Sequence, residues 1–330
     1  MSLRKTIVTI IAAIVLHQSP AFAAKPAGFD DALNQFAREM SAKHGFDQTQ
    51  LSALLTEVEY QQSIIDAISR PAEGKPWHQY RPIFVNDARA TEGVKFWEEN
   101  QELLTRAEQS YGVPPEIIVA IIGVETRYGR HAGRYSVVDA LSTLAFGYPK
   151  RAAFFRQQLE EFLLLIKEEG LSARDSLGSY AGAMGKPQFI PSSYRAYAVD
   201  FDGDGKRDLL NNNADVIGSV AAYFSRHGWT PGKPITGKAK GVTAAHQHFI
   251  DAGMKPSISI ATLQQAGIVA DTPAAPDALA SLIRLEGESA DEHWLGLDNF
   301  YVITRYNHSN LYAMAVYQLS QEILKRKRSS

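Results

Sequence analysis

The chain has 330 residues, of which 45% are apolar and 21% charged, and it contains no cysteine. This length is enough for one or two domains with a sizeable core, and the composition argues against a disordered or fibrous chain. The 34 basic and 36 acidic residues give a net charge of −2, which argues against a general nucleic-acid binder because such a protein needs a basic surface. The lack of cysteine excludes disulfides, thiolate metal sites and cysteine nucleophiles.

The first 23 residues have the pattern of a cleaved secretory signal peptide. Two basic residues, Arg4 and Lys5, precede an apolar run over residues 7–16, and Ala-Phe-Ala at residues 21–23 provides a cleavage site. A ten-residue run is too short for a helix across about 30 Å of hydrocarbon. We therefore expect an exported protein that is soluble after cleavage and has no membrane anchor.

Periodic apolar residues predict a mainly helical chain. They recur at three- and four-residue steps, which is the spacing of one helix face. The expected helices cover residues 29–69, 91–111, 116–128, 136–169 (in two segments), 215–226 and 310–325. We do not expect a continuous helix over residues 71–82, because Pro71, Pro76 and Pro82 each remove a backbone donor.

The composition changes at Trp229 and divides the mature chain into three parts. Residues 24–228 are expected to form a helical part and a core. Residues 229–299 are rich in glycine and proline and contain short β-branched runs, which predicts a small β-containing insert. We expect Phe300–Ile303 to be its last strand. Residues 300–330 would complete the core and end in a solvated basic tail.

One acidic residue ends the most apolar of these helices. Glu125 directly follows a wholly apolar run over residues 117–124 and shares a helix face with Ile121. A carboxyl group there loses water, which favours the protonated form. Such an acid can donate a proton to a glycosidic oxygen. The alternative is a structural glutamate paired with Arg127 or Arg130.

A glycine-rich loop covers residues 179–192. Gly182 and Gly185 allow the backbone to approach a ligand closely, and Gln188 offers both a donor and an acceptor for sugar hydroxyls. An ordinary tight loop is the alternative. Near the C-terminus, residues 306–312 combine tyrosine and asparagine, which are residue types that stack on and hydrogen-bond to sugars.

An acidic loop over residues 200–208 resembles the start of an EF-hand. It places carboxylates at loop positions 1, 3, 5 and 9 and glycine at position 6. Position 12 is Asn211 instead of glutamate, and Asp215 could close the site from the next helix. Because closely packed aspartates repel one another without a cation, we predict a structural Ca²⁺ site. A solvated acidic turn is the alternative.

Four motifs together resemble the lytic murein transglycosylase B family. They are Gly-Val-Glu-Thr-Arg-Tyr-Gly at residues 123–129, the glycine-rich loop, the acidic loop with its following helix, and Arg-Tyr-Asn-His-Ser at residues 305–309. They occur in the family's order and span nearly all of the mature chain. The resemblance implies a mainly α-helical (α+β) protein with a lysozyme-like core, a helical N-terminal part and a small β-containing insert.

The resemblance also implies an activity and a set of site residues. The expected reaction cleaves the β-1,4 bond between N-acetylmuramic acid and N-acetylglucosamine in peptidoglycan and leaves 1,6-anhydromuramoyl ends. Glu125 would be the single catalytic acid and base. The residues expected to line the glycan groove are Tyr80, Ser179, Gln188, Tyr223, Tyr306, Asn307 and Tyr312. The cation, Ca²⁺ or Na⁺, would be held by Asp200, Asp202, Asp204, Asp215 and the carbonyl of Lys206.

Several features set the chain apart within this resemblance. Lys186 places a charge in the glycan-facing loop, and Phe154 stands where a groove tyrosine is found in other members. The absence of a lipid-attachment cysteine makes the chain similar to the soluble periplasmic members. The expected partner is the glycan strand, with no cofactor for the chemistry. The remaining alternatives are a hydrolytic lysozyme-like muramidase, a non-catalytic peptidoglycan-binding protein and a secreted calcium-binding module.

Overall fold

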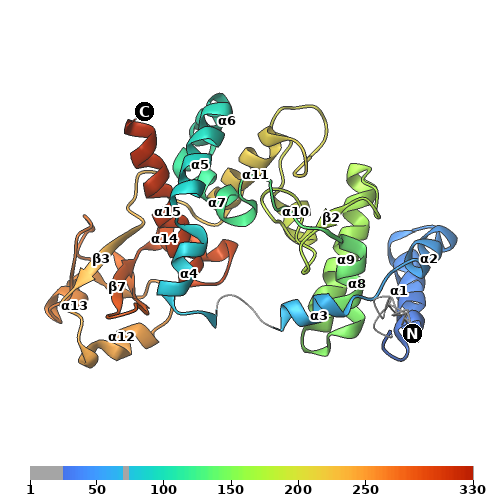
Figure 1. Ribbon diagram of the computed structural model, residues 1–330, viewed down its shortest axis with the longest axis horizontal. Helices are drawn as coiled ribbons and strands as arrows, with labels where there is room; N and C mark the ends of the chain where they lie inside the picture. The colour runs from blue at the N-terminus through green and yellow to red at the C-terminus, as the bar shows by residue number, and fades with distance from the viewer. Residues whose placement is uncertain (1–24, 70–73, 330) are drawn as a thin grey trace, which may run out of the picture.

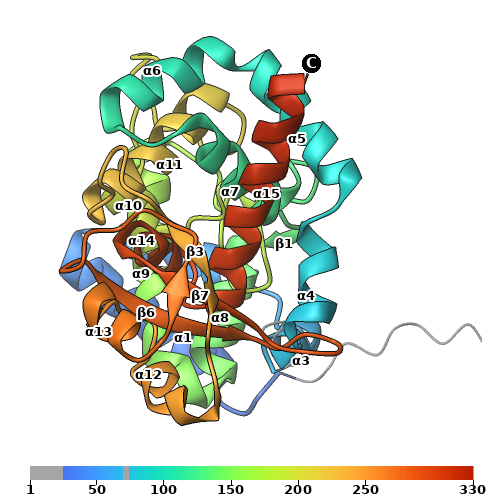
Figure 2. The same ribbon diagram turned by 90° about the vertical axis from the view of Figure 1, so that its left-hand side faces the viewer.

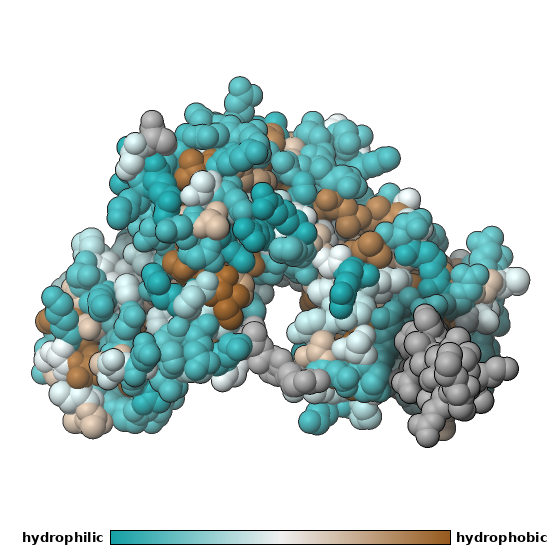
Figure 3. All heavy atoms as spheres, viewed as in Figure 1, coloured by the Kyte–Doolittle hydropathy of each residue, from teal (hydrophilic) through white to brown (hydrophobic). Residues whose placement is uncertain are grey.

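The computed structural model describes residues 25–69 and 74–329. The predicted signal peptide, residues 1–23, lies outside the described residues. Figure 1 shows the elements gathered on two sides of the molecule, which α10 (Pro191–Tyr197) and α11 (Asn213–Arg226) connect. Figure 3, which has the same view as Figure 1, shows that the surface of the molecule is hollowed between these two sides. In the described part of the chain, no helix has the length and apolar content that crossing a bilayer requires.

One side is built mainly from helices near the N-terminus. It contains α1 (Phe29–His44), α2 (Gln48–Thr56), α3 (Gln62–Ile68), α8 (Val137–Gly147) and α9 (Ala152–Glu169), with the 3-10 turn η2 (Pro149–Arg151) between the last two. The prediction of helix over residues 29–69 is confirmed as three helices. Gly45, with φ of 66°, ends α1, and the Asp47 side chain caps α2 by accepting from the Gln50 N–H. The two segments predicted over residues 136–169 are confirmed. Beside α8 lies a two-stranded ladder of β1 (Tyr135–Ser136) and β2 (Leu177–Gly178).

The stretch after Pro76 forms a helix in spite of its prolines. α4 (Trp77–Phe84) contains Pro82 in its interior. The stretch is therefore not one continuous helix, as expected, but Pro82 does not prevent a helix after Pro76. An interior proline costs roughly 3 kcal/mol. Trp77 and Tyr80 are each 1% exposed, and burying two such side chains contributes about 3–6 kcal/mol. Burial therefore outweighs the missing donor.

The single helix predicted over residues 91–111 is in fact two helices. α5 (Asp87–Glu99) and α6 (Gln101–Tyr111) meet at Asn100. The Asn100 side chain is buried and donates to the carbonyl oxygen of Phe96 at 2.8 Å. An asparagine side chain that hydrogen-bonds a nearby backbone group competes with the hydrogen bonds of the helix and so favours a break in it.

The centre of the other side is α7 (Pro115–Thr126), which is buried almost all round. Its residues 117–122 are 0% exposed, and proline at its first position tolerates the missing N–H. α15 (Asn310–Ser329) packs along α7 and α5. Figure 2 shows α15 running lengthwise through the molecule between α7 and α5. This packing brings the start of α15 to the end of α7.

Two expectations for the C-terminal region are wrong. Phe300–Ile303 is part of α14 (Asp298–Tyr306) and not a strand, because a short apolar run does not by itself distinguish strand from buried helix. The basic residues 325–328 continue α15 and are not a free tail. Arg326 donates to Asp87 at 2.6 Å, and Lys327 donates to Glu98 at 3.3 Å.

A five-stranded antiparallel sheet occupies the region between Trp229 and α14. Its strand order is β4-β6-β7-β3-β5, and Ile283 pairs with Trp294 in the central β6–β7 register. The strands are β3 (Thr236–Lys240), β4 (Ile258–Ser259), β5 (Val269–Ala270), β6 (Leu279–Leu285) and β7 (Glu292–Gly296), with η3 (Ala244–His246), α12 (Gln247–Asp251) and α13 (Ile260–Gln265) between them. Leu263 and Ile268 are 0% exposed in a separate small core. The limits 24–228, 229–299 and 300–330 remain predictions about domains.

The packing of α7 predicts that a glycine-to-alanine substitution in this helix lowers the stability of the protein instead of raising it. In a helix interior, glycine to alanine normally gains about 1 kcal/mol. At Gly123 the added Cβ would lie 2.5 Å from the hydroxyl and 2.7 Å from Cζ of Tyr128. Overpacking of this kind costs roughly 1–3 kcal/mol, so we expect Gly123→Ala to lower the melting temperature in a thermal scan. Gly74→Ala, where no atom lies within 4 Å of the added Cβ, is the control. A melting temperature that rises for Gly123→Ala would contradict the packing.

Candidate active site at the end of helix α7

Helix α7 ends abruptly just after Glu125. Arg127 and Tyr128 have φ of 50° and 60°, which is the left-handed region that costs a non-glycine residue about 1–2 kcal/mol. Two such residues in succession persist only where the surroundings hold them, and backbone strain of this kind clusters at functional sites. The stop in the helix fixes where the Glu125 side chain emerges.

A network of charged and aromatic side chains holds this strained turn. Arg127 donates twice to Glu92, both at 2.7 Å, and Arg130 donates to the same carboxylate at 2.9 Å. Hydrogen bonding to Arg127 is the largest cause that lowers the pKa of Glu92. Both arginines therefore pair with Glu92, which corrects the alternative that they are the partners of Glu125.

A second cation closes the end of the helix. Arg89 donates to the carbonyl oxygen of Gly123 at 2.6 Å and to that of Val124 at 3.3 Å, where a positive charge suits the helix dipole. Tyr128 donates to the carbonyl oxygen of Arg89 at 2.9 Å and stacks on Phe96. α5 thus supplies the groups that stop α7.

Glu125 is half-buried and is held by a phenol from α15. The Tyr312 hydroxyl lies 2.5 Å from Oε1 of Glu125. Burial, and then the charge of Glu125, raises the pKa of Tyr312 well above its ordinary value, so its hydroxyl stays protonated and donates at neutral pH. Tyr306 stacks on Tyr312 with 6.4 Å between ring centroids. Tyr312 thereby fixes the orientation of the Glu125 carboxyl group.

The glycine-rich loop is anchored to this site at three points. Thr126 donates to the carbonyl oxygen of Lys186 at 2.9 Å, and Tyr306 donates to that of Pro187 at 2.7 Å. Gln188, with φ of 53°, donates from its amide to the carbonyl oxygen of Ala132 at 3.0 Å. The Gln188 nitrogen is thus used inside the protein, which leaves its side-chain oxygen for a ligand.

The other residues predicted to line the groove lie around this centre with different exposure. Ser179 is half-buried and accepts from the Ala183 N–H of its own loop at 3.1 Å. Tyr223 is 7% exposed and donates to the carbonyl oxygen of Arg305 at 2.6 Å. Tyr80 is buried against Trp77, and Asn307 is half-buried at the end of α14. Their contact with a glycan stays a prediction.

The acidic loop gathers three carboxylates as expected. Ligand oxygens of Asp200, Asp202 and Asp204 lie within 4.8 Å of one another, and all three residues are exposed. Asp215, which is 0% exposed, accepts from the Phe201 N–H and the Asp208 N–H, each at 2.7 Å. Burial is the largest cause that raises its pKa, and the charges of Asp202 and Asp200 add to it. Asp215 therefore ties together the two ends of the loop, but it is not part of the group of three carboxylates.

Several residues of this site were not predicted from sequence. Thr126 lies inside the recognised motif, but nothing in the motif shows that its hydroxyl bridges α7 and the glycine-rich loop. Arg89 and Glu92 lie on α5, more than 30 residues before the group they support. The sequence shows that Lys186 brings a charge into the glycine-rich loop, but not its partner: its ammonium donates to Asn213 of α11 at 2.5 Å. Burial lowers the pKa of Lys186.

Thr126 offers a test of the link between helix and loop. Its buried hydroxyl donates to the Lys186 carbonyl and accepts from the Gly129 N–H at 3.0 Å. Thr126→Val keeps the shape of the side chain but leaves the Lys186 carbonyl and the Gly129 N–H without this partner. Each lost hydrogen bond costs about 1–3 kcal/mol of stability. For Thr126→Val we expect faster amide hydrogen exchange over residues 179–192 and a lower kcat for the peptidoglycan cleavage that the sequence resemblance implies. Thr126→Ser keeps the hydroxyl and is the matched control. Equal exchange and equal kcat in the two variants would show that the contact does not position the loop.

Comparison with known proteins places this chain in a family. The chain matches the family described as Transglycosylase SLT domain over residues 28–321. It is 44% identical over 299 residues to the membrane-bound lytic murein transglycosylase B of Escherichia coli strain K12, covering 88% of this chain and 81% of that protein.

Solved structures agree with this assignment. The soluble lytic transglycosylase SltB1 from Pseudomonas aeruginosa is 51% identical with a TM-score of 0.85, covering 91% of this chain and 100% of that one. The Escherichia coli lytic transglycosylase Slt35 in complex with calcium is 43% identical with a TM-score of 0.82, covering 93% and 96%. The expected mainly helical fold with a lysozyme-like core is confirmed. The chain therefore belongs to the Transglycosylase SLT family and is a lytic murein transglycosylase that acts on peptidoglycan.

Proposed function

We propose that Glu125 is the single acid and base with which this lytic transglycosylase cleaves the N-acetylmuramic acid to N-acetylglucosamine β-1,4 bond. The observation that carries the proposal is the Glu125 carboxyl group, fixed by the Tyr312 hydroxyl at 2.5 Å at the end of a buried helix. Most glycosidases use two carboxylates. Glu92, the other carboxylate of the network at the end of α7, is bound by Arg127 and Arg130 and is not free for a second role.

The sugar supplies the second group in this mechanism. Protonated Glu125 gives its proton to the bridging oxygen, and the bond from that oxygen to C1 of the muramic acid breaks. The 2-acetamido carbonyl oxygen of the same sugar stabilises the positive charge that develops at C1. Glu125, now a carboxylate, takes the proton of the C6 hydroxyl as O6 bonds to C1. Glu125 is protonated again, and the product is a 1,6-anhydromuramoyl end with no water consumed.

Proximity makes the intramolecular attack efficient. The C6 hydroxyl belongs to the same ring as C1, so the nucleophile does not have to be bound from solution, which lowers the barrier by several kcal/mol. The protein then needs only to hold Glu125 where it reaches both the leaving oxygen and O6. The double contact of Thr126 and the hydrogen bond from Tyr312 provide that fixed position.

Replacement of Glu125 tests the assignment. Glu125→Gln keeps the shape and removes the transferable proton, so we expect the kcat for digestion of purified sacculi to fall by about 10³-fold. The melting temperature should stay close to that of the wild type, because no cavity forms. Glu102→Gln, an exposed change at the start of α6, is the control. Turnover in Glu125→Gln that matches the control would refute the role of Glu125.

We also propose that the acidic loop binds a structural Ca²⁺ ion. Asp200, Asp202 and Asp204 would supply carboxylate oxygens, with Asp215 and the carbonyl oxygen of Lys206 completing the set. Oxygen ligands of this kind suit Ca²⁺, and the related Slt35 was crystallised with calcium. Each carboxylate oxygen has two lone pairs, so the N–H groups that Asp215 accepts leave it able to bind a cation. The ion would supply charge compensation and no chemistry.

Calcium removal gives a stability test. An ion at 100 times its Kd stabilises a folded protein by about 2.7 kcal/mol, which in a protein of this size raises the melting temperature by several degrees. We expect EDTA to lower the melting temperature and Ca²⁺ to restore it. Asp204→Asn should abolish that response, whereas Asp31→Asn on the exposed face of α1 should keep it. The same melting curve with and without EDTA would remove the site.

We propose the periplasm as the place of action. The leader expected over residues 1–23 and the peptidoglycan substrate support it. A reporter that is active only after export, fused to the end of the chain, should be active in cells, and an inactive reporter would contradict the location.

A further inference from the structure

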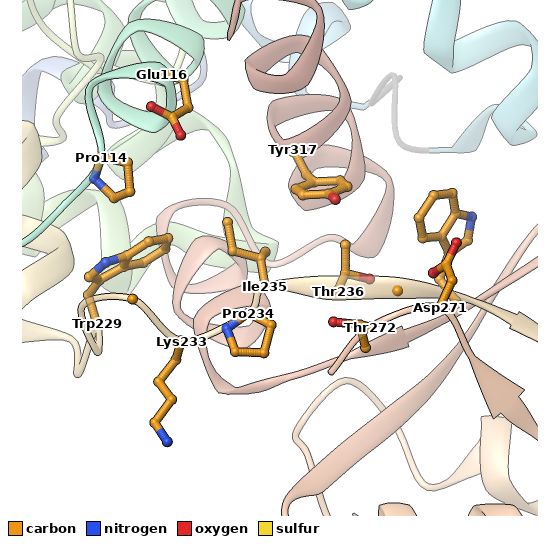
Figure 4. Close-up of a pocket in the computed structure, with 13 residues that line it drawn as sticks. Pro114, Glu116, Trp229, Lys233, Pro234, Ile235, Thr236, Asp271, Thr272 and Tyr317 are labelled. Atoms are coloured by element: carbon orange, nitrogen blue, oxygen red, sulfur yellow. The ribbon is translucent and has the colours of Figure 1, made fainter. Parts of the chain in front are cut away.

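A cavity lies at the other end of α7, between that helix, α15 and the segment that enters the sheet. Its volume is about 490 Å³. Figure 4 shows Glu116 of α7 and Tyr317 of α15 on one side, with Trp229, Pro234 and Ile235 opposite. Glu116 precedes Glu125 by nine positions, so it lies about 13 Å away along the helix axis. The cavity is therefore separate from the catalytic centre.

The floor of this cavity is fixed before any ligand binds. The Trp229 indole donates to the carbonyl oxygen of Gly112 at 3.0 Å. Asn299, which is 1% exposed, accepts from the Thr230 N–H at 2.9 Å and donates to the carbonyl oxygen of Lys233 at 3.1 Å. These bonds clamp residues 229–233 in one position. A preformed wall lowers the entropy cost of binding.

The cavity holds a carboxylate that forms no ion pair within 4 Å in the described chain. Glu116 is half-buried and makes no salt bridge or side-chain hydrogen bond to any other residue in the described chain. Burial is the largest cause that raises its pKa, and the charge of Glu108 adds to it, whereas a hydrogen bond to its own backbone and the charge of Arg328 only partly offset this rise. Lys233 also lines the cavity, but Figure 4 shows its side chain pointing away from Glu116 and Tyr317. A desolvated, unpaired carboxylate is costly, and a bound cation would compensate it.

Aromatic rings surround this carboxylate. Trp229 and Tyr317 flank it in Figure 4, and Trp294, whose ring centroid lies 6.3 Å from that of Tyr317, extends the wall. Asp271 lies at the far end, and its charge contributes, after burial, to raising the pKa of Tyr317. Ammonium groups are attracted to aromatic faces as well as to carboxylates. Acidic and aromatic groups together favour an amine over an anion or a neutral sugar.

A second cavity of about 820 Å³ neighbours the first, and Trp294 and Tyr317 line both. The second cavity adds Arg81 and Lys238, neither of which forms an ion pair within the described chain. Arg81 donates only to the neutral Gln318, at 2.6 Å. The lining also contains the carboxylates of Glu288, Glu292 and Glu322, and Glu292 accepts from the Trp294 indole at 3.1 Å. We call the two neighbouring cavities together the trough: its first part is acidic and aromatic, and its second part contains cations as well as carboxylates.

We propose that this trough binds a stem peptide of peptidoglycan, with the free side-chain ammonium of the peptide's diamino acid between Glu116, Trp229 and Tyr317. Peptide carboxylates then lie toward Arg81 and Lys238. A stem peptide carries an amine and carboxylates on one short chain, which matches the charges of the trough. The inference rests on peptidoglycan as the substrate, but not on the role of Glu125. The enzyme holds its polymer by the peptide at one end of α7 and cuts glycan at the other.

Binding of a defined peptide tests the proposal. The probe is a murein tripeptide with meso-diaminopimelic acid at its end, compared with the same peptide after acetylation of its amines, by calorimetry on the full mature chain. We expect acetylation, and the change Glu116→Gln, each to weaken binding by about tenfold or more, a loss of about 1.4 kcal/mol. Tyr317→Ala, which removes a ring instead of the charge, should also weaken it. Glu102→Gln, an exposed change at the start of α6, should bind as the wild type does.

The outcomes separate this proposal from that for Glu125. Glu125→Gln should retain peptide binding while losing turnover, so failure of the catalytic assignment leaves the peptide result intact. The proposal is overturned by a wild-type chain that does not bind the tripeptide, by equal affinity for the acetylated peptide, or by undiminished binding in folded Glu116→Gln and Tyr317→Ala. Displacement of the tripeptide by peptide-free glycan would also overturn it, because it would assign the trough to sugar.

Discussion

The candidate active site depends on the sharp end of one buried helix. α7 is apolar through residues 117–122 and stops at two residues in the left-handed conformation, Arg127 and Tyr128. Their strain is offset by the Glu92 carboxylate, which binds Arg127, and by the Tyr128 contact with α5. The same stop leaves Glu125 half-buried, where the α15 phenol reaches it. The packing of the core around α7 thus stabilises the strained turn that holds the Glu125 carboxyl group in place.

Hydrogen bonds between residues far apart in the sequence connect the end of α7 to the neighbouring loops. The Lys186 N–H donates to the carbonyl oxygen of Leu209 at 3.0 Å, and its own carbonyl oxygen accepts from Thr126. The acidic loop, the glycine-rich loop and the end of α7 are therefore joined through Lys186. The proposed cation site in the acidic loop and the alignment of Glu125 therefore belong to one connected structure.

Much of this arrangement could be predicted from the sequence. The apolar run before Glu125 and the periodicity of residues 29–69 and 136–169 gave the helices, because local spacing determines which face is buried. Phe300–Ile303 was misread because it is too brief to show its period, and the break at Asn100 was missed because the apolar spacing continues across it. Pro82 is tolerated within α4 because its neighbours are deeply buried. The pairing of Arg127 with Glu92 and the contact of Thr126 with Lys186 could not be predicted, since they join residues 35 and 60 positions apart.

The central claim is that a single carboxyl group activates the substrate's own C6 hydroxyl in place of water. The most direct measurement is mass spectrometry of the products that the purified enzyme releases from sacculi in water enriched in heavy oxygen. Intramolecular attack predicts products that are lighter by one water than those of hydrolysis and that carry no heavy oxygen at the muramic acid end. Reducing ends that contain the heavy isotope would contradict the account and make the enzyme a hydrolase.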